Sequence, residues 1–180
     1  NKGNKVIGVV AQKDESIEDP TAKDIHGTGT VARILRVLKM PDGNVTVIIQ
    51  GKKRFKIAEV ITEEPYMNAT TREIPEARPA VSNKEFNAII DSIKDLALQI
   101  IKDSPNIPSE ASFAIKNIES TSFLVNFVSS NMNLSVAEKQ SLLEINDLKK
   151  RALETLKYMN VEFQKLELKN DIQSKVQMDM

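Results

Sequence analysis

The sequence predicts an α+β chain in which a mostly antiparallel β-rich part precedes a helical bundle. All 6 glycines lie at or before Gly51, and all 7 prolines lie at or before Pro108. Residues 109–180 therefore lack both strong helix breakers, which is typical of a helical region. The first part instead carries β-branched runs separated by turn residues. Strands that precede helices in this way indicate an α+β fold rather than alternating βαβ units.

Within the β-rich part, expected over residues 1–78, the central feature is a β-hairpin. Apolar residues in Thr28–Lys39 also match helical spacing, but the turn sequence Pro41-Asp42-Gly43 and the strand-like run Val45–Gln50 follow directly. A hairpin of these two runs is therefore favoured. The other expected elements are a strand at Lys5–Gln12, a loop at Lys13–His26, a strand at Arg54–Ile61 that begins after Gly51, and an exposed edge strand at Tyr66–Ile74.

The helical part is expected over residues 79–180, after a proline-containing linker at Arg72–Asn83. Capping boxes, in which a serine and a glutamate three residues later satisfy each other's backbone amides, mark two helix starts. The expected elements are a helix from the box Ser82–Glu85 to about Lys102, short helices at Ala111–Ile118 and Thr121–Ser130, a start at the box Ser135–Glu138, and a long helix from about Asp147.

The long helix carries an apolar stripe whose members are spaced by alternating steps of four and three residues. Its members are Ala152, Leu156, Met159, Phe163 and Leu166. Such a stripe packs either against the helix's own bundle, which the pattern favours, or against a partner helix as in a coiled coil. Beyond Leu168 apolar residues become sparse, so we expect the helix to run outward from the bundle. The chain begins at Asn1 without an initiator methionine, and we expect it to be an excised part of a longer protein.

Composition excludes several classes of protein. The chain has 25 basic and 25 acidic side chains, no cysteine and a single histidine, His26. Disulfides, thiolate nucleophiles and cysteine-ligated metals are therefore impossible, and a triad or a histidine-pair metal site cannot be assembled. No apolar run approaches the roughly 18 residues of a membrane span, and no signal-peptide pattern is present. We expect a cytoplasmic protein with no metal, no catalytic residue and no membrane contact.

Two short motifs suggest ligands but have simpler interpretations. Gly27–Ala32 fits the dinucleotide fingerprint G-x-G-x-x-A, yet it follows a polar loop rather than a strand, so no bound cofactor is expected. Lys52–Lys56 is a basic stretch around Phe55 that could reach at most about four phosphates of a nucleic acid. Because the net charge is zero, a solvated strand end is the favoured interpretation.

Three segments in this order resemble the N-terminal domain of Lon, the ATP-dependent protease also called protease La. They are Gly29–Ile34 entering a strand, the turn Pro41-Asp42-Gly43, and Ile49–Phe55, which contains the pattern x-G-x-x-R. The second half, including Leu142–Leu166, is similar to the helical bundle and linker helix that follow the sheet in Lon. The resemblance covers nearly the whole chain, and it implies a further first strand upstream of Asn1.

The resemblance implies a substrate-recognition and oligomer-supporting region of a hexameric serine protease that degrades misfolded and regulatory proteins. ATP and Mg²⁺ would bind an ATPase module outside this chain, so we expect the chain itself to be no enzyme. The positions that carry the motifs are Gly29, Thr30, Ala32, Asp42, Gly43, Gly51 and Arg54. For the glycines and Asp42 the implied role is turn geometry. The alternatives are a stand-alone adaptor of the same fold and a nucleic-acid-contacting module that uses Lys52–Lys56.

A module that captures unfolded or degron-bearing polypeptides needs exposed apolar side chains that accept many sequences. Methionine suits such a surface because it adapts its shape. We therefore name four candidate substrate contacts: Met40 at the expected hairpin tip, and Tyr158, Met159 and Phe163 on the long helix. Packing within the chain's own core is the alternative role for each of them.

Overall fold

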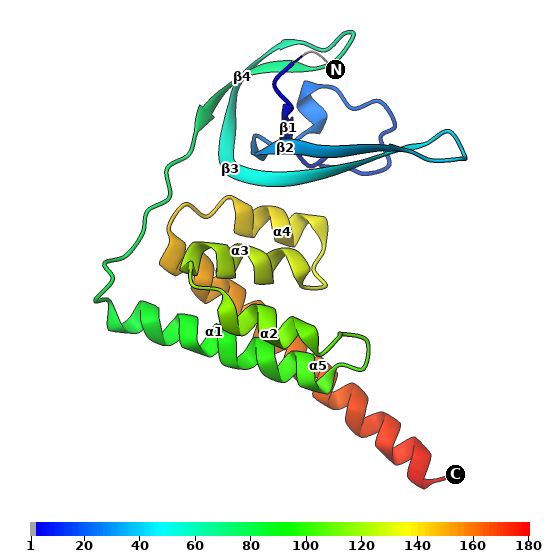
Figure 1. Cartoon of the computed structure of the whole chain (residues 1–180), viewed down its shortest axis with the longest axis vertical. Coiled ribbons are helices and arrows are strands. Elements are labelled where there is room, and N and C mark those ends of the chain that lie inside the picture. Colours follow the sequence, from blue (N-terminus) through cyan, green and yellow to red (C-terminus); the bar gives the residue numbers. More distant parts are fainter. Residues whose placement is uncertain (1–2) are drawn as a thin grey trace. The chain divides into compact units, whose positions relative to one another are not determined.

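The computed structural model describes residues 3–180, which confirm the predicted α+β order (Figure 1). The chain divides into two compact units, one that ends at Pro75 and one that covers Glu76–Met180. The division lies three residues before the boundary expected between residues 78 and 79. We call them the sheet unit and the helical unit and describe each by itself.

The part of the sheet unit that the structure describes contains a four-stranded antiparallel sheet in the order β1-β2-β3-β4. Each strand therefore pairs with its neighbour in sequence, as the turn-rich sequence predicts. The strands are β1 (Val6–Val9), β2 (Thr28–Lys39), β3 (Val45–Thr62) and β4 (Asn68–Glu73). A short 3₁₀ helix, η1 (Ala22–Asp24), interrupts the predicted loop between β1 and β2.

The predicted hairpin is present, because Lys39 of β2 pairs with Val45 of β3. In its turn Gly43 adopts a φ of 87°. This left-handed conformation strains every residue except glycine. The Asp42 carboxylate accepts hydrogen bonds from the backbone and side-chain amides of Asn44. The turn sequence therefore closes the hairpin through local hydrogen bonds.

The expectation of two strands separated at Gly51 is wrong, because β3 runs unbroken through that residue. The break is replaced by a bulge: Val31 pairs with Lys53 and Ala32 pairs with Gly51, which leaves Lys52 as the extra residue. A Cβ atom at Gly51 would lie 3.2 Å from the Thr30 methyl group. Gly51 thus provides close strand approach beside the bulge rather than a strand end.

Close backbone approach also shapes the small core of the sheet unit around Phe55. A Cβ atom at Gly29 would lie 2.4 Å from the Val9 carbonyl oxygen and 2.9 Å from the Phe55 ring, distances that no side chain tolerates. Gly8 likewise faces the Phe55 ring. Glycine at these positions lets β1 and β2 pass close to the Phe55 ring, which is buried.

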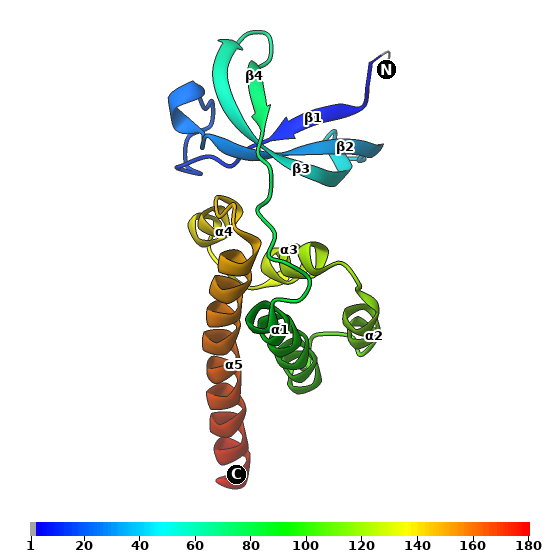
Figure 2. The ribbon, with the colours of Figure 1, turned by 90° about the vertical axis from the view of Figure 1, so that its left-hand side faces the viewer.

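The helical unit consists, over its described residues, of five helices (Figure 2). They are α1 (Lys84–Asp103), α2 (Glu110–Asn117), α3 (Thr121–Asn131), α4 (Val136–Leu143) and α5 (Leu148–Met178). One apolar core joins α1 to the N-terminal half of α5, with contributions from the three shorter helices. The C-terminal end of α5 extends past the other helices, as predicted (Figure 1). No helix in the described residues combines the length and apolarity needed to cross a membrane.

One of the two predicted capping boxes is present, and the other is replaced by a single side-chain cap one residue later. At Ser135 the side chain accepts from the Glu138 amide and Glu138 accepts from the Ser135 amide, as predicted. At α1 the cap is Asn83 rather than Ser82, because the Asn83 side chain accepts from the Phe86 amide at 2.9 Å. Glu85 instead forms an ion pair with Lys149 at 2.8 Å.

The first residues of the helical unit are held against the N-terminus of α5. Buried Arg151 donates a hydrogen bond to the Glu76 carboxylate, which also accepts from Ser122 at 3.1 Å. Two backbone hydrogen bonds also hold Ala77 at the start of α5. The Ala77 amide donates to the Asn146 carbonyl, and the Leu148 amide donates to the Ala77 carbonyl. The middle of the predicted linker is therefore anchored to the helices.

Candidate functional site

The carboxylates with altered pKa values have structural partners rather than catalytic ones. Hydrogen bonds lower the pKa of four carboxyls at turns and helix starts: Asp14 from Ser16, Asp24 from Thr21, Asp42 from Asn44, and Glu138 from Ser135. No group of three or more metal-ligating side chains lies together within residues 3–180. The arrangement of titratable groups therefore indicates turn and cap stabilisation.

Most of the exposed large apolar side chains of the sheet unit lie on the outer part of the β2–β3 hairpin. β1 pairs with β2 only as far as Arg33, and β4 pairs with β3 only from Phe55 onward. Between those limits, residues 34–50 form a ribbon of two strands, which we call the hairpin arm (Figure 1). A two-stranded ribbon is only marginally stable alone in water.

One face of the hairpin arm is apolar. Directly opposed residues in an antiparallel pair share a face, and residues two apart on one strand share it too. Val45, Val47 and Ile49 alternate along β3 and oppose Lys39, Val37 and Ile34, so Lys39 is the charged residue at the tip end of this otherwise apolar face. The side chains of Val37, Val45, Val47 and Ile49 are all exposed. The opposite face mixes Leu38 and Ile48 with Arg36, Thr46 and Gln50.

An apolar face of this kind is unusual on the surface of a monomer. Contiguous exposed apolar patches mark protein interaction surfaces more often than scattered apolar residues do. The arm also places Met40 at its tip, where the residue is 44% exposed. Of the four predicted contact residues, Met40 therefore lies on the surface best suited to bind an apolar polypeptide.

The three candidates on α5 differ in exposure. Met159 is only 1% exposed and belongs to the core that α1 and α5 share. The prediction that Met159 contacts substrate is therefore wrong, since a side chain enclosed by the bundle cannot contact a ligand while the unit is folded. Tyr158 and Phe163 are half-buried, and Tyr158 packs against the same core. The apolar stripe of α5 thus packs on its own bundle at Ala152 and Met159.

The basic stretch Lys52–Lys56 lacks an available aromatic ring. Phe55 is 3% exposed, so its ring cannot stack on a nucleic-acid base. Lys53 forms an ion pair with Glu73 at 2.9 Å, and Lys52 donates a hydrogen bond to Gln50 at 2.9 Å. These contacts are typical of a solvated strand, which is the interpretation that the sequence favours.

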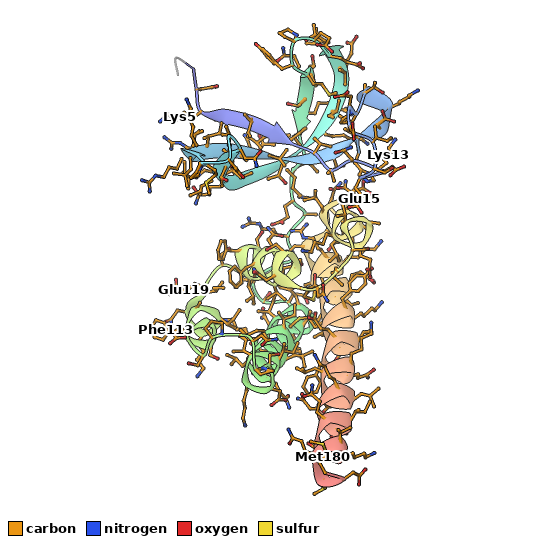
Figure 3. All side chains as sticks on the ribbon, turned by 90° about the vertical axis from the view of Figure 1, so that its right-hand side faces the viewer. Lys5, Lys13, Glu15, Phe113, Glu119 and Met180 are labelled. Carbon is orange, nitrogen blue, oxygen red and sulfur yellow. The ribbon has the colours of Figure 1, made fainter. Side chains whose placement is uncertain are left out.

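Sequence reasoning missed the exposed aromatic residues of the helical unit. Phe113 on α2 is 74% exposed and Phe123 on α3 is 56% exposed. Figure 3 shows Phe113 directed away from the other helices. Both lie in runs that were assigned simply as apolar helices. The signal that could have separated them is helical phase: Phe113 and Ile115 lie two residues apart, and only Ile115 is buried.

The family described as the ATP-dependent protease La (LON) substrate-binding domain matches residues 1–161. The chain belongs to this family. The first part of the Lon protease of Flavobacterium johnsoniae is 73% identical over 180 residues, which is all of this chain and 22% of that protein. The Lon protease of Cytophaga hutchinsonii is 46% identical over 99% of this chain and 22% of its own length.

The chain thus spans about a fifth of the length of the Lon proteases that it matches. A solved structure, the N-terminal domain of the Lon protease of the Mycobacterium avium complex, has the same fold. It superposes with a TM-score of 0.65 at 19% identity, covering 86% of this chain and 89% of that one. The resemblance proposed from Gly29–Phe55 and the predicted fold class are both confirmed.

Proposed function

We propose that this Lon substrate-binding domain captures exposed apolar segments of unfolded polypeptides on the apolar face of its hairpin arm. The observation that carries the proposal is the row of exposed Val37, Val45, Val47 and Ile49 on a ribbon that no further described strand flanks. Unfolded chains differ from folded ones chiefly in exposed apolar side chains. A flat apolar face with a flexible methionine at its tip accepts such chains without reading a sequence.

The wider role follows from the family and extends beyond this chain. We propose that the full-length protein is a cytoplasmic, homohexameric serine protease that uses ATP and Mg²⁺ bound outside residues 1–180. In that arrangement this region binds protein substrates and has no peptidase activity of its own. A single capture site should bind weakly, with a Kd of about 1 µM or higher, and six copies would raise the avidity through effective concentration.

The test is binding of the chain to fluorescein-labelled, reduced and carboxymethylated lactalbumin, followed by fluorescence anisotropy. Val37→Thr combined with Val47→Thr keeps the shape and strand propensity of the arm but makes the face polar. We expect this variant to bind at least about threefold more weakly, since each change removes apolar contact area. Native lactalbumin should not bind.

The matched control is Ile48→Thr, which alters the same strand on its opposite face. Ile48 and Val47 are 44% and 43% exposed, so the two changes remove comparable apolar surface. Equal losses from Ile48→Thr and Val47→Thr would show that the apolar face is not the site. A steep loss of binding with added salt would instead favour polyanion contact through Lys52–Lys56. Peptide hydrolysis by the chain would contradict the non-catalytic role.

A further inference from the structure

The helical unit contains a surface that lacks charge. Residues 120–137 include no aspartate, glutamate, lysine or arginine, although charged residues make up 28% of the chain. This segment spans α3 and the start of α4. Solvated helices normally carry charges on the face opposite their apolar stripe. An uncharged outer face is therefore a feature that folding alone does not require.

The outer face of α3 presents an aromatic pair. Leu124, Val125 and Val128 point into the core. The opposite side carries Phe123, Asn126, Phe127 and Ser130, spaced by three, four and seven residues, which we call the uncharged stripe. The rings of Phe123 and Phe127 stack with centroids 5.9 Å apart and planes inclined by 22°.

The stacking holds the exposed ring in a defined place. Phe127 is half-buried and packs against the core, whereas Phe123 is more than half exposed. A ring supported in this way loses little conformational freedom on binding, which favours its use as an anchor. Interface cores are depleted in charge and enriched in aromatic residues, and the uncharged stripe has both properties.

Two charged side chains, Glu76 and Lys139, form hydrogen bonds with α3 near its ends. Glu76 accepts a hydrogen bond from Ser122 and pairs with Arg151. Lys139 donates to the Ser130 carbonyl at 3.0 Å, at the C-terminal end of the helix. Neither contact involves the side chains of Phe123, Asn126 or Phe127, so the middle of the stripe stays neutral.

We propose that the uncharged stripe is a second binding surface, for short, uncharged segments of extended substrate polypeptides that carry aromatic or large aliphatic side chains. The proposal rests on the polypeptide-binding function proposed above and adds a site and a substrate class to it. Asn126 supplies an exposed amide beside the rings, and asparagine with aromatic residues is a combination that binding loops of antibodies also use.

The size of the stripe decides between a peptide and a second copy of the chain. The 11 residues of α3 span about 16 Å, and a helix is about 10 Å wide. The footprint is therefore on the order of 160 Å², far below the roughly 800 Å² per partner that a stable dimer buries. About five residues of extended chain match the 16 Å length.

The experiment measures binding of short fluorescein-labelled peptides to the whole 180-residue chain by fluorescence anisotropy. The probe contains serine, asparagine and glycine with a pair of phenylalanines, and companion peptides replace these by serine or add glutamates. Phe123→Ser should weaken binding of the phenylalanine probe about tenfold, as loss of an anchor residue does. Phe123→Leu should recover part of that affinity, since it restores apolar volume without the ring.

Phe113→Ser is the matched control, because Phe113 is even more exposed but lies between Glu110 and Lys116 on α2. It should change affinity less than twofold. An equal loss from Phe113→Ser would overturn the proposal, because binding would then follow total exposed apolar area. Unchanged binding by Phe123→Ser would also overturn it. Concentration-dependent dimerisation that Phe123→Ser abolishes would assign the stripe to a second copy and contradict the peptide site.

Lactalbumin binding separates this proposal from the broader one. If the wild-type chain fails to bind reduced, carboxymethylated lactalbumin, the polypeptide-binding function itself fails. If the wild-type chain binds it and Phe123→Ser leaves the phenylalanine probe unaffected, only the assignment of the uncharged stripe fails. Circular dichroism of each variant at 222 nm confirms that the helices remain folded.

Discussion

The helical unit encloses a large apolar core, whereas the sheet unit buries few of its apolar side chains. Among the described residues, the core of α1 to α5 contains fourteen buried apolar residues. In the sheet unit only Ala32 and Phe55 are buried to that extent within the part of the chain that the structure describes. Both units contain apolar residues, but the helical unit gathers far more of them into a core.

This difference separates stability from binding. Burial of an aliphatic side chain contributes about 1.5–3 kcal/mol to folding, and an exposed one contributes little. The helical unit therefore gains most of the hydrophobic stabilisation, while the apolar face of the hairpin arm remains available to a ligand. The function proposed for the hairpin arm is consistent with this division, since the proposed binding surface need not unfold in order to be exposed.

The largest expected effect tests the core of the helical unit. Leu124→Ala should lower the free energy of unfolding by about 3 kcal/mol, because Leu124 is fully buried and its loss leaves a cavity. Urea denaturation followed by circular dichroism at 222 nm measures the change. Val47→Ala on the hairpin arm is the counterpart and should cost less than about 0.5 kcal/mol. Comparable losses of stability from the two changes would contradict the proposed difference between the two units.

The second effect concerns the contacts of Glu76 with Arg151 and Ser122. Burial opposes ionisation of this group, but hydrogen bonds from Arg151 and Ser122 outweigh burial and lower the pKa of Glu76. Glu76→Gln should therefore lower the free energy of unfolding at neutral pH by about 2 kcal/mol, since it leaves buried Arg151 without its counter-charge.

The contact between Glu76 and Arg151 also predicts how the stability of the fold depends on pH. Because the folded pKa lies below the unfolded one, ionised Glu76 stabilises the fold above the ordinary glutamate pKa of about 4.3. That contribution is lost as pH falls through the lower folded pKa. Thermal unfolding of the wild-type chain and of Glu76→Gln between pH 7 and pH 3 should thus show the difference in stability between them shrinking on acidification. A difference that stays constant would show that the charge of the Glu76 carboxylate does not stabilise the fold.

The third effect tests the small core of the sheet unit. Gly29→Ala should lower its stability by about 1–2 kcal/mol, because the new Cβ would overlap the Val9 carbonyl and the Phe55 ring. Gly27→Ala is the control, since no atom outside its immediate neighbours lies within 4 Å of a Cβ there. Hydrogen–deuterium exchange should rise in β1, β2 and β3 for Gly29→Ala and remain unchanged in α1 and α5. Increased exchange in α1 to the same degree would show that the two units unfold together.

The sequence predicted the elements with strong local signals and missed what depends on distant neighbours. The hairpin was predictable because Pro41-Asp42-Gly43 favours a turn through its own backbone preferences. The continuity of β3 was not, because Gly51 looks like a strand end until its pairing with Ala32 and the close approach of the Thr30 methyl group are known. Met159 shows the same limit at the candidate site. Its place on the stripe was correct, but only the packing of α1 shows that it is buried.

The smallest expected effect tests the displaced cap at the start of α1. Ser82 and Asn83 are adjacent, and both residue types favour the N-cap position, so local preference alone does not separate them. The structure separates them, because the Asn83 side chain accepts from the Phe86 amide while Glu85, required by a box at Ser82, pairs with Lys149. Asn83→Ala should thus lower the free energy of unfolding by about 1 kcal/mol, and Ser82→Ala by less than about 0.5 kcal/mol. Urea unfolding at 222 nm resolves this difference, and a larger loss from Ser82→Ala would return the cap to the position that the capping-box pattern indicates.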